Sequence, residues 1–498
     1  MAEPFYITTA ISYPNGPPHI GHAYEAIATD VIARFQRAQG RDVRFQTGTD
    51  EHGLKMAQAA RAVGQEPREF AGRMSSLFQD MCDRLDISYD RFIRTSESDH
   101  YRASEAIWKA MEAKGDVYLG HYEGWYSVRD EAFYEESELT AGEGGERLSP
   151  QGTPVEWTAE ESWFFKLSAY GEKLLDHYAA NPDFIRPESR RNEVLRFVEG
   201  GLADLSISRT SFDWGVPVPG SQGHVMYVWL DALTNYVTGL GYPEDTDEWR
   251  RYWPADVHMI GKDVVRFHAV YWPAFLMSAG IELPRQVYGH GFLLSRGEKM
   301  SKSVGNVVDP LALANSFGVD ALRYFLMREV TFGQDGSYSA EAIVNRVNAE
   351  LANSFGNLAQ RTLSMIFKNL EGVLPAPGNK REDSDLLGDV DRAVAELTDK
   401  FQDFAFSAGL EAWMSAVFAC NAYVDTAAPW ALRKTDPARM AEVLGTLVAA
   451  IRKLAEAVVP VIPASAQKLV DVIDAGFQAP IAQPVPLFPR LEIEEPAQ

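Results

Sequence analysis

The sequence is poor in cysteine, has no long hydrophobic run and carries no excess of positive charge. Only 2 of its 498 residues are cysteines, Cys82 and Cys420, which excludes a disulfide-stabilised scaffold and a zinc site built on thiolates alone. The most apolar stretch, residues 447–462, is interrupted by three charged side chains. A membrane-spanning helix needs about 18 mostly apolar residues in succession, so we expect no membrane span.

The charge balance is acidic, with 47 lysines and arginines against 70 aspartates and glutamates and a net charge of −23. Such a balance disfavours broad, non-specific binding to nucleic acid but is compatible with a local basic patch. The hydrophobic fraction of 46 % is typical of globular domains, and the length corresponds to about three of them. No basic segment followed by an apolar one opens the chain, so we expect no secretory signal and a location in the cytoplasm.

The first fifty residues show the alternation of a parallel α/β sheet. Residues 5–11 predict a strand, and the three prolines and one glycine of 14–18 predict a loop. A helix is predicted over about 19–38, with Gly40 as its C-terminal stop, and a second strand over 43–47. Strand, helix and strand joined by tight loops are typical of α/β domains.

From about residue 115 to 223 the pattern changes. Aromatic and acidic residues alternate, and a polar loop rich in glycine and proline follows, so this segment is predicted to be an insertion with a small core of its own. The α/β pattern resumes with strand-like segments at 225–229, 257–260 and 286–290. Beyond about 340, helical periodicity marks 341–370, 386–406, 408–426 and 437–473. We therefore divide the chain into 1–114, 115–223, 224–340 and 341–498.

Two short segments carry the strongest chemical signals. In His19-Ile20-Gly21-His22, the histidines stand three apart on the first turn of the predicted helix, so both project from one face. That turn has free backbone N–H groups and the positive end of the helix dipole, which favour an anion. Gly21 leaves room between the rings for a flat group such as adenine. Alone, such a pair is most often a solvated surface feature.

The second segment is Lys299-Met300-Ser301-Lys302-Ser303. Its lysines, its serines and the flanking glycines are typical of a mobile loop that brings ammonium and hydroxyl groups to a polyphosphate. Alone, it is most often a solvated basic loop. Together, in this order and about 280 residues apart, the two segments are far more specific than either is by itself.

The pair resembles the two signatures of the class I aminoacyl-tRNA synthetases, and its surroundings resemble the methionyl-tRNA synthetase family. The matching stretches run in order through nearly the whole chain: TAISYPNG (9–16), TGTDEHG (47–53), VWLDA (228–232), IGKD (260–263), FH (267–268), WPA (272–274), GHG (289–291), NLAQR (357–361) and APW (428–430). The resemblance implies an α/β fold with a Rossmann-like parallel-sheet catalytic domain, formed by 1–114 and 224–340 with the KMSKS loop. It also implies a small connective-peptide insertion over 115–223 and an α-helical anticodon-binding bundle over 341–498.

The activity that the resemblance implies is that of a methionine–tRNA ligase. Such an enzyme activates L-methionine with ATP to methionyl-adenylate and pyrophosphate, and then transfers methionine to the 3′ end of its initiator and elongator tRNAs. The methionine carboxylate is itself the nucleophile, so the protein needs only to position the reactants and stabilise charge on the phosphates. The resemblance assigns catalysis and ATP binding to His19, His22, Lys299 and Lys302, and further ATP contacts to Gly21, Gly261 and Asp263. Mg²⁺ is expected with ATP, held mainly by phosphates and water.

The resemblance also assigns the amino-acid pocket, to the backbone around Ile11 and to Tyr13, Asp50, Trp229, Tyr236, Phe267, His268 and Trp272. Asp50 would hold the substrate ammonium by a charge-assisted hydrogen bond. A thioether favours aromatic, polarizable surroundings with little charge, at ~0.3–1.5 kcal/mol per sulfur–aromatic contact. Trp229 and Tyr236 stand seven apart, on one face if that stretch is helical. Without the resemblance, ordinary core packing would be the preferred interpretation of these aromatics.

Anticodon reading is assigned by the resemblance to Asn357, Arg361, Pro429 and Trp430. Unpaired bases are recognised by stacking and by hydrogen bonds to their edges, and a stacked tryptophan contributes ~1–3 kcal/mol. Asn357 and Arg361 stand at i and i+4 and share one helix face. Such a pair alone is usually part of a solvated helix surface.

The expected partners are methionine, ATP and methionine tRNAs, without a membrane. The insertion contains no cysteine, unlike zinc-bearing members of the family, so we expect no structural zinc. The chain ends soon after the predicted bundle, which predicts a monomer. Three alternatives stay open: a small-molecule nucleotidyltransferase with the same histidine motif, a non-catalytic RNA-binding relative of the synthetases, and a class I enzyme that activates cysteine, which the low cysteine count opposes.

Overall fold

The computed structural model describes residues 2–142, 145–295 and 307–492. The chain forms two compact units, one of Met1–Thr29 and Gly40–His290 and the other of Asp30–Gln39 and Gly291–Gln498. Helix α1 (Ile20–Ala38) therefore contributes its first turns to one unit and its last turns to the other. The four segments predicted from the sequence divide the chain at other positions and stay a prediction.

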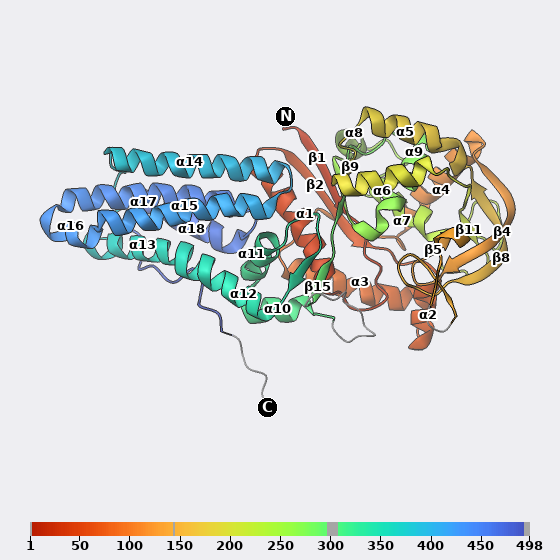
Figure 1. The fold of residues 1–498 in the computed structure, drawn as a ribbon, viewed down its shortest axis with the longest axis horizontal. Helices are drawn as coiled ribbons and strands as arrows, with labels where there is room; N and C mark the ends of the chain where they lie inside the picture. The colour runs from red at the N-terminus through yellow and green to blue at the C-terminus, as the bar shows by residue number, and fades with distance from the viewer. Residues whose placement is uncertain (1, 143–144, 296–306, 493–498) are drawn as a thin grey trace. The chain divides into compact units, whose positions relative to one another are not determined.

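A six-stranded sheet forms the centre of the first unit (Figure 1). Its strand order is β3-β2-β1-β13-β14-β9, and every neighbouring pair is parallel, which confirms the predicted α/β class with a Rossmann-like sheet. The strands are β1 (Pro4–Thr9), β2 (Asp42–Thr49), β3 (Arg91–Arg94), β9 (Ile185–Arg186), β13 (Val257–Gly261) and β14 (Val287–His290). Strand β9 comes from the predicted insertion yet forms an edge of this sheet.

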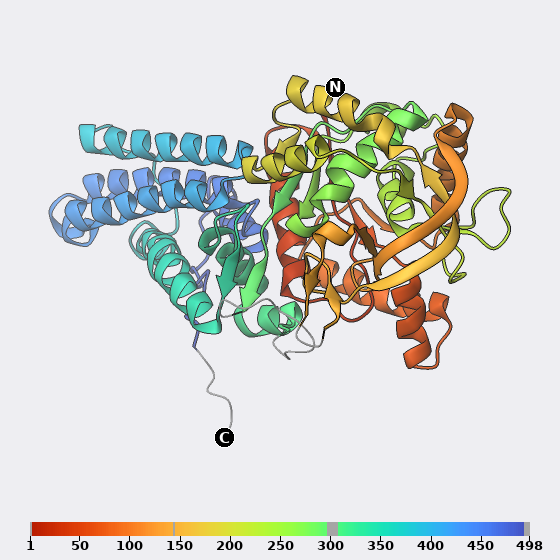
Figure 2. The same ribbon diagram turned by 45° about the vertical axis from the view of Figure 1, so that its right-hand side comes forward.

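A four-stranded antiparallel sheet, β10-β8-β4-β5, forms the core of the predicted insertion. Its long central ribbon, β4 (Val117–Ser127) with β8 (Glu156–Phe165), is prominent in Figure 2. The other strands of the insertion and its surroundings are short: β5 (Ala132–Tyr134), β6 (Thr140–Ala141), β7 (Arg147–Leu148), β10 (Leu205–Ser206), β11 (Ser208–Arg209) and β12 (Val225–Met226).

The predicted strand at 225–229 is wrong. Strand β12 ends at Met226 and helix α7 (Val228–Thr238) begins two residues later. Nearly every side chain of α7 is buried, so its sequence is apolar all round, and a short apolar run does not distinguish a buried helix from a strand.

The other helices of this unit are α2 (Leu54–Ala62), α3 (Pro67–Arg84), α4 (Ser98–Lys114), α5 (Gly171–Ala180), α6 (Glu188–Glu199), α8 (Asp247–Tyr252) and α9 (Trp272–Ala279), with the helical turns η1 (Glu136–Glu138), η2 (Leu167–Tyr170), η3 (Lys262–Val264) and η4 (Phe267–Tyr271).

The second unit is mainly helical, as predicted. Helices α14 (Arg381–Gln402), α15 (Phe406–Ala427) and α17 (Pro437–Val458) lie side by side in Figures 1 and 2. The remaining elements are α10 (Pro310–Phe317), α11 (Val319–Glu329), α12 (Ala340–Arg346), η5 (Val347–Gly356), α13 (Asn357–Asn369), α16 (Pro429–Thr435) and α18 (Pro463–Gly476), with strands β15 (Leu293–Ser295) and β16 (Gly336–Tyr338).

The helical periodicity predicted over 437–473 is confirmed, and the structure divides this segment into two helices, because α17 ends at Val458 and α18 begins at Pro463. Proline has no N–H to donate inside a helix but fits the first helical position, where that donor has no partner anyway. Pro460 and Pro463 therefore separate two helices. Among the described helices, none combines the length and the apolar character needed to cross a membrane.

Candidate functional site

The two histidines of the first segment lie at the N-terminal end of α1. Nδ1 of His22 accepts the backbone N–H of His19 at 3.1 Å, and Nδ1 of His19 accepts that of Gly21 at 3.1 Å, so the rings satisfy donors of the open helix end. The ring centroids are 3.8 Å apart, which closes the space that the sequence analysis placed between them. A Cβ atom on Gly21 would lie 2.9 Å from the His19 ring, so glycine permits this approach.

The second predicted segment, with Lys299 and Lys302, lies outside the described residues, and its role stays a prediction. Gly261 ends strand β13, and Asp263 follows in the helical turn η3. Both therefore stand at the carboxyl edge of the parallel sheet, where α/β folds bind their ligands.

A buried carboxyl that the sequence analysis missed joins this edge. Glu25 stands three residues after His22 on α1, and its Oε2 lies 2.8 Å from Nε2 of His290, the last residue of β14. The backbone N–H of Gly261 also donates to Glu25. Burial raises the pKa of Glu25, and the bond from His290 opposes that shift. The i+3 spacing from His22 was the signal that could have found it.

Five predicted pocket residues form one aromatic cluster, with Trp229 and Tyr236 on α7 and Phe267, His268 and Trp272 on η4 and α9. The rings of Trp229 and Phe267 stack, with centroids 3.8 Å apart and planes 5° apart. The Tyr236 hydroxyl lies 2.6 Å from Nε2 of His268, and its ring centroid is 6.1 Å from that of Trp272. The π-helical form of η4 places consecutive residues on this surface, and such turns are frequent at functional sites.

The aromatic cluster carries no charge at neutral pH. Nδ1 of His268 lies 2.9 Å from the carbonyl oxygen of Val264, which only accepts, so this nitrogen carries the proton and Nε2 accepts from Tyr236. Burial lowers the pKa of His268 to about 4. The imidazole is therefore neutral, and the surroundings are polarizable and uncharged.

Asp50 is a buried carboxyl directly after β2, with 7 % of its surface exposed. Burial raises its pKa well above the usual range, and the negative charges of Asp231 and Glu131 raise it further. Its Oδ1 has no hydrogen-bond partner within the described part of the chain. A buried acceptor left without a donor is unfavourable by itself, so this oxygen is suited to a ligand that brings a donor and positive charge.

The remaining predicted residues of the amino-acid pocket follow strand β1. Ile11 is half-buried and precedes Ser12, which bridges to Thr49 at the end of β2. The hydroxyl of Tyr13 accepts the backbone N–H of Met56 at 3.0 Å. Residues after β1 and β2 thus come together at the same sheet edge, as parallel strands require.

Two further buried charged residues were not found from the sequence. Glu131, in the loop after β4, has φ of 50° and is 6 % exposed; its Oε1 accepts the backbone N–H of Lys55. Arg209 is 2 % exposed, and its guanidinium lies 4.1 Å from the centroid of the Phe133 ring. Nε and Nη2 of Arg209 have no hydrogen-bond partner among the described residues, although Nε lies 3.7 Å from Oε1 of Glu160. Neither residue lies in a short motif, so only the folded chain brings them to notice.

In the helical unit, the predicted base-reading residues differ in how accessible they are. Trp430 is 53 % exposed on the first turn of α16, directly after the buried Pro429. Asn357 is exposed at the start of α13. Arg361 instead donates from Nη2 to Oδ1 of Asn421 at 2.9 Å, so its guanidinium is already bound to α15 in this conformation.

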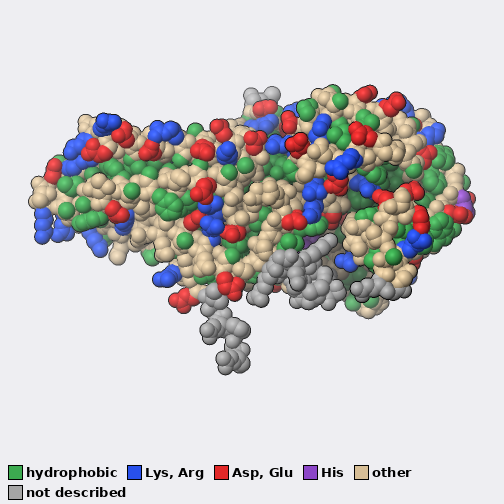
Figure 3. All heavy atoms as spheres, in the orientation of Figure 1, with side chains coloured by type: hydrophobic (Ala, Val, Ile, Leu, Met, Phe, Trp, Pro, Cys, Tyr) green, Lys and Arg blue, Asp and Glu red, His purple; other side chains and the backbone are tan. Residues whose placement is uncertain are grey.

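Lysine and arginine side chains gather at the end of the helical unit where α16 lies (Figure 3). The last turn of α16 carries Arg433 and Lys434. This local basic surface lies next to the exposed Trp430. A net charge of −23 is compatible with a local basic patch of this kind.

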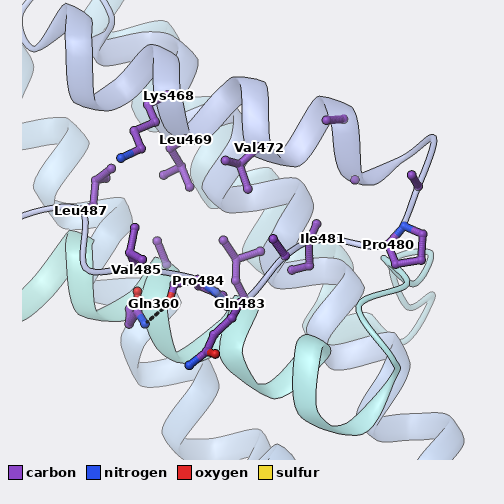
Figure 4. A pocket seen from close by; sticks show the side chains of 16 residues that line it. Gln360, Lys468, Leu469, Val472, Pro480, Ile481, Gln483, Pro484, Val485 and Leu487 are labelled. Atoms are coloured by element: carbon purple, nitrogen blue, oxygen red, sulfur yellow. Dashed lines mark hydrogen bonds between the residues drawn. The ribbon is translucent and has the colours of Figure 1, made fainter.

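The C-terminal segment 478–492 runs along the helix that carries Asn357. Nε2 of Gln360 donates to the carbonyl of Pro484 at 3.1 Å, and the side-chain amide of Asn348 pairs with both the N–H and the carbonyl of Leu491. Beneath the segment lies a mainly apolar cavity of about 320 Å³, between α13 and α18 (Figure 4). The backbone of segment 478–492 is therefore hydrogen-bonded to a side chain of α13.

Both cysteines are buried and unpaired with each other. Among the residues that the structure describes, no three His, Cys, Asp or Glu side chains lie together as metal ligands would. The expectation that the chain binds no structural zinc stays a prediction.

Comparison with known proteins agrees with this architecture. Residues 5–144 and 146–363 match the family described as tRNA synthetases class I (M), and residues 374–482 match the anticodon binding domain of methionyl tRNA ligase. The chain therefore belongs to the class I (M) family of tRNA synthetases, which confirms the resemblance seen in the sequence.

Individual relatives cover the whole chain. The methionine–tRNA ligase of Brucella suis is 58 % identical over 98 % of this chain and 98 % of its own, and that of Mycobacterium bovis is 55 % identical over 100 % and 99 %. The structure of Mycobacterium tuberculosis methionyl-tRNA synthetase in complex with methionyl-adenylate superposes with a TM-score of 0.95 at 56 % identity, covering 98 % of this chain and 100 % of that one. The free form of the same synthetase gives a TM-score of 0.87.

Proposed function

We propose that this chain is a methionine–tRNA ligase. It forms methionyl-adenylate and pyrophosphate from L-methionine and ATP, and then transfers methionine to the 3′ end of initiator and elongator methionine tRNAs. The observation that carries the proposal is a buried carboxyl with a free acceptor, Asp50, in the same unit as an uncharged aromatic cluster. An ammonium group complements the first and a thioether the second. The names of the full-length relatives support it.

Methionine binding uses these two features. The ammonium group donates to Asp50, which becomes the carboxylate as it gains a counter-charge. The thioether packs among Trp229, Tyr236 and Phe267, with His268 and Trp272 behind them, while the backbone around Ile11 and the side chain of Tyr13 line the same sheet edge. The neutral His268 avoids placing a charge against sulfur.

Adenylate formation needs no protein nucleophile. An oxygen of the methionine carboxylate attacks the α-phosphorus of ATP, a new O–P bond forms, and the bond from that phosphorus to the departing pyrophosphate breaks. His19, His22 and the open N-terminus of α1 stabilise the negative charge that builds on the phosphates. Lys299 and Lys302 bind the β- and γ-phosphates, whereas Gly21, Gly261 and Asp263 hold the adenosine. Mg²⁺ accompanies ATP, held mainly by phosphate and water oxygens.

The acyl group then passes to the terminal adenosine of the tRNA, first to its 2′-hydroxyl. The helical unit reads the anticodon, with the indole of Trp430 stacked on an unpaired base and Asn357 directed at a base edge. Arg361 contributes to base reading once its guanidinium is released from Asn421. Pro429 sets the first turn of α16. The enzyme acts in the cytoplasm as a monomer.

The test is methionine-dependent exchange of labelled pyrophosphate into ATP, without tRNA, using protein treated with EDTA and resupplied only with Mg²⁺. Exchange with methionine, but not with cysteine, isoleucine or valine, is the expected result. Folded, monodisperse protein that gives no exchange would favour either a zinc requirement or a non-catalytic RNA-binding relative. Exchange with cysteine, or with an acid other than an amino acid, would instead favour the alternative enzymes.

A further inference from the structure

A buried histidine–aspartate–histidine cluster lies beside the predicted pocket residues and has no role assigned so far. Asp231 of α7 is 0 % exposed, and each of its oxygens meets one imidazole. Oδ2 lies 2.6 Å from Nδ1 of His52, and Oδ1 lies 2.7 Å from Nε2 of His100. Both histidines are at most 1 % exposed. One carboxyl thus joins the loop after β2, helix α4 and helix α7.

The direction of these hydrogen bonds follows from the charge of Asp231. Burial by itself raises the pKa of this carboxyl, but His52 and His100 lower it to about 2. An ionised carboxylate only accepts, so Nδ1 of His52 and Nε2 of His100 both carry protons and donate to it. Nε2 of His52 also lies 3.0 Å from the Tyr101 hydroxyl, so the ring is held at both nitrogens.

The cluster lies between the two ends of the proposed amino-acid pocket. His52 follows Asp50 by two residues, and its backbone N–H opposes the rise in the pKa of the Asp50 carboxyl. Asp231 stands on the same helix as Trp229 and Tyr236, two residues after the first and five before the second. The His52–Asp231 bond is therefore a direct side-chain link from the ammonium end to the thioether end.

We propose that Asp231, with His52 and His100, is a positioning clamp that sets the span between Asp50 and the aromatic cluster, and thereby selects amino acids by side-chain length. This inference rests on the proposed function. A buried ion pair contributes little net stability compared with apolar packing, whereas a displacement of about 1 Å in a binding site can cost about 100-fold in rate. Fixed geometry is thus the larger effect that such a cluster supplies.

The test compares variants that keep an N–H donor to Asp231 with variants that remove it. His100→Gln places an amide N–H where Nε2–H stood, and His100→Leu removes it; His52→Asn and His52→Leu form the same pair for Nδ1. Asp231→Asn keeps the shape but has only one acceptor oxygen for two donors. Ser104→Ala is the matched control, because its hydroxyl lies 3.3 Å from the same His100 nitrogen without contributing a donor to Asp231 in the cluster.

The readouts are KM for methionine, KM for ATP, and the preference for methionine over ethionine, which is one methylene longer, in pyrophosphate exchange. For Asp231→Asn, His100→Leu and His52→Leu we expect KM for methionine to rise about tenfold or more. The preference over ethionine should fall several-fold while KM for ATP stays within about twofold. His100→Gln, His52→Asn and Ser104→Ala should stay close to wild type.

Other outcomes would overturn the clamp. Parallel losses in melting temperature and in both KM values would make the cluster a purely structural one, and an unchanged preference over ethionine would remove its role in length selection. If Asp231→Asn does not fold, the comparison of His100→Gln with His100→Leu tests the proposal instead. Wild-type protein without methionine-dependent exchange would refute the proposed function itself, which is a different result from active wild type with unaffected variants.

Discussion

The two units of the chain present the side chains of their proposed sites in opposite ways. In the sheet unit, the residues at the carboxyl edge are withdrawn from water: Asp50 is 7 % exposed, and His268 is 2 % exposed. In the helical unit, Trp430 is 53 % exposed. Charge stabilisation on a small molecule is strongest where water is excluded, whereas unpaired bases must reach a side chain from outside. The contrast matches one unit to chemistry and the other to reading RNA.

Asp50 of the sheet unit and Asp383 of the helical unit, both buried carboxyls, differ in the same sense. In the sheet unit, burial raises the pKa values of Glu25, Asp50 and Glu131. In the helical unit, burial acts on Asp383 too, but the hydrogen bonds from Arg439 hold its pKa below the ordinary value. A carboxyl paired with arginine is satisfied within the fold. Of the three raised carboxyls, Asp50 has an oxygen without a hydrogen-bond partner in the described part of the chain, and a cationic ligand would satisfy it.

Replacing Asp50, the buried carboxyl of the sheet unit, should have the largest effect on kcat/KM for methionine. Asp50→Asn keeps the shape but removes the counter-charge of the substrate ammonium, and losing one partner of a buried charge pair costs up to about 5 kcal/mol, roughly 4 × 10³-fold in kcat/KM for methionine. Pyrophosphate exchange at varied methionine measures it. A loss of less than about tenfold would mean that Asp50 is not the ammonium site.

The second largest effect is expected when His22, which is proposed to stabilise charge on the phosphates of ATP, is replaced. His22→Ala should lower adenylate formation about 10²-fold, as removal of one group that stabilises transition-state charge does, while the affinity for tRNA stays unchanged. Single-turnover adenylate formation and tRNA binding by filter retention separate the two steps. His121→Ala, on the exposed face of β4, is the matched histidine control and should leave both values unchanged. Equal damage to both steps would break the division of labour between the units.

Trp430→Ala should give the reverse pattern. Loss of a stacked base costs ~1–3 kcal/mol, so KM for tRNA should rise about tenfold with exchange of pyrophosphate unaltered. Phe418→Ala is the control, because Phe418 is a comparably exposed aromatic of the same unit, at 55 %. If KM for tRNA rises to the same extent in both variants, Trp430 does not recognise a specific base.

The smallest expected effect is a pH dependence of methionine binding. The raised pKa of Asp50 means that the free enzyme holds this carboxyl protonated below that pKa. The ammonium requires the carboxylate, so KM for methionine should rise as pH falls through the raised pKa, by at most about tenfold per pH unit for one proton. KM for ATP should not follow. Asp50→Asn should abolish the dependence; persistence in that variant would assign it to another group.

Much of the site followed from local spacing. Of the two histidines at the predicted helix start, His22 lies on the first turn of α1 and His19 directly precedes it, and the residues after the first two strands do meet at one sheet edge. Trp229 and Tyr236 share α7, although the strand predicted at 225–229 was wrong. Periodicity could not decide there, because a fully buried helix and a buried strand have the same apolar composition.

Other groups became visible only in the folded chain. Glu25 and His290 are 265 residues apart in sequence, and Asp231 lies 179 residues from His52 and 131 from His100. No motif links them, because hydrogen bonds of this kind depend on where the sheet and its helices bring distant segments together. The unsatisfied oxygen of Asp50 likewise depends on every neighbour of that carboxyl.

By itself, the sequence determined the class of fold and the family, because local periodicity and turn residues indicate the first and the order of motifs along the chain indicates the second. Only the tertiary structure decided which carboxyls lack a partner, which imidazoles are neutral and which helix face is open to solvent. Burial and long-range contact set those properties, and a pKa or an exposed fraction has no value until the surrounding segments are in place.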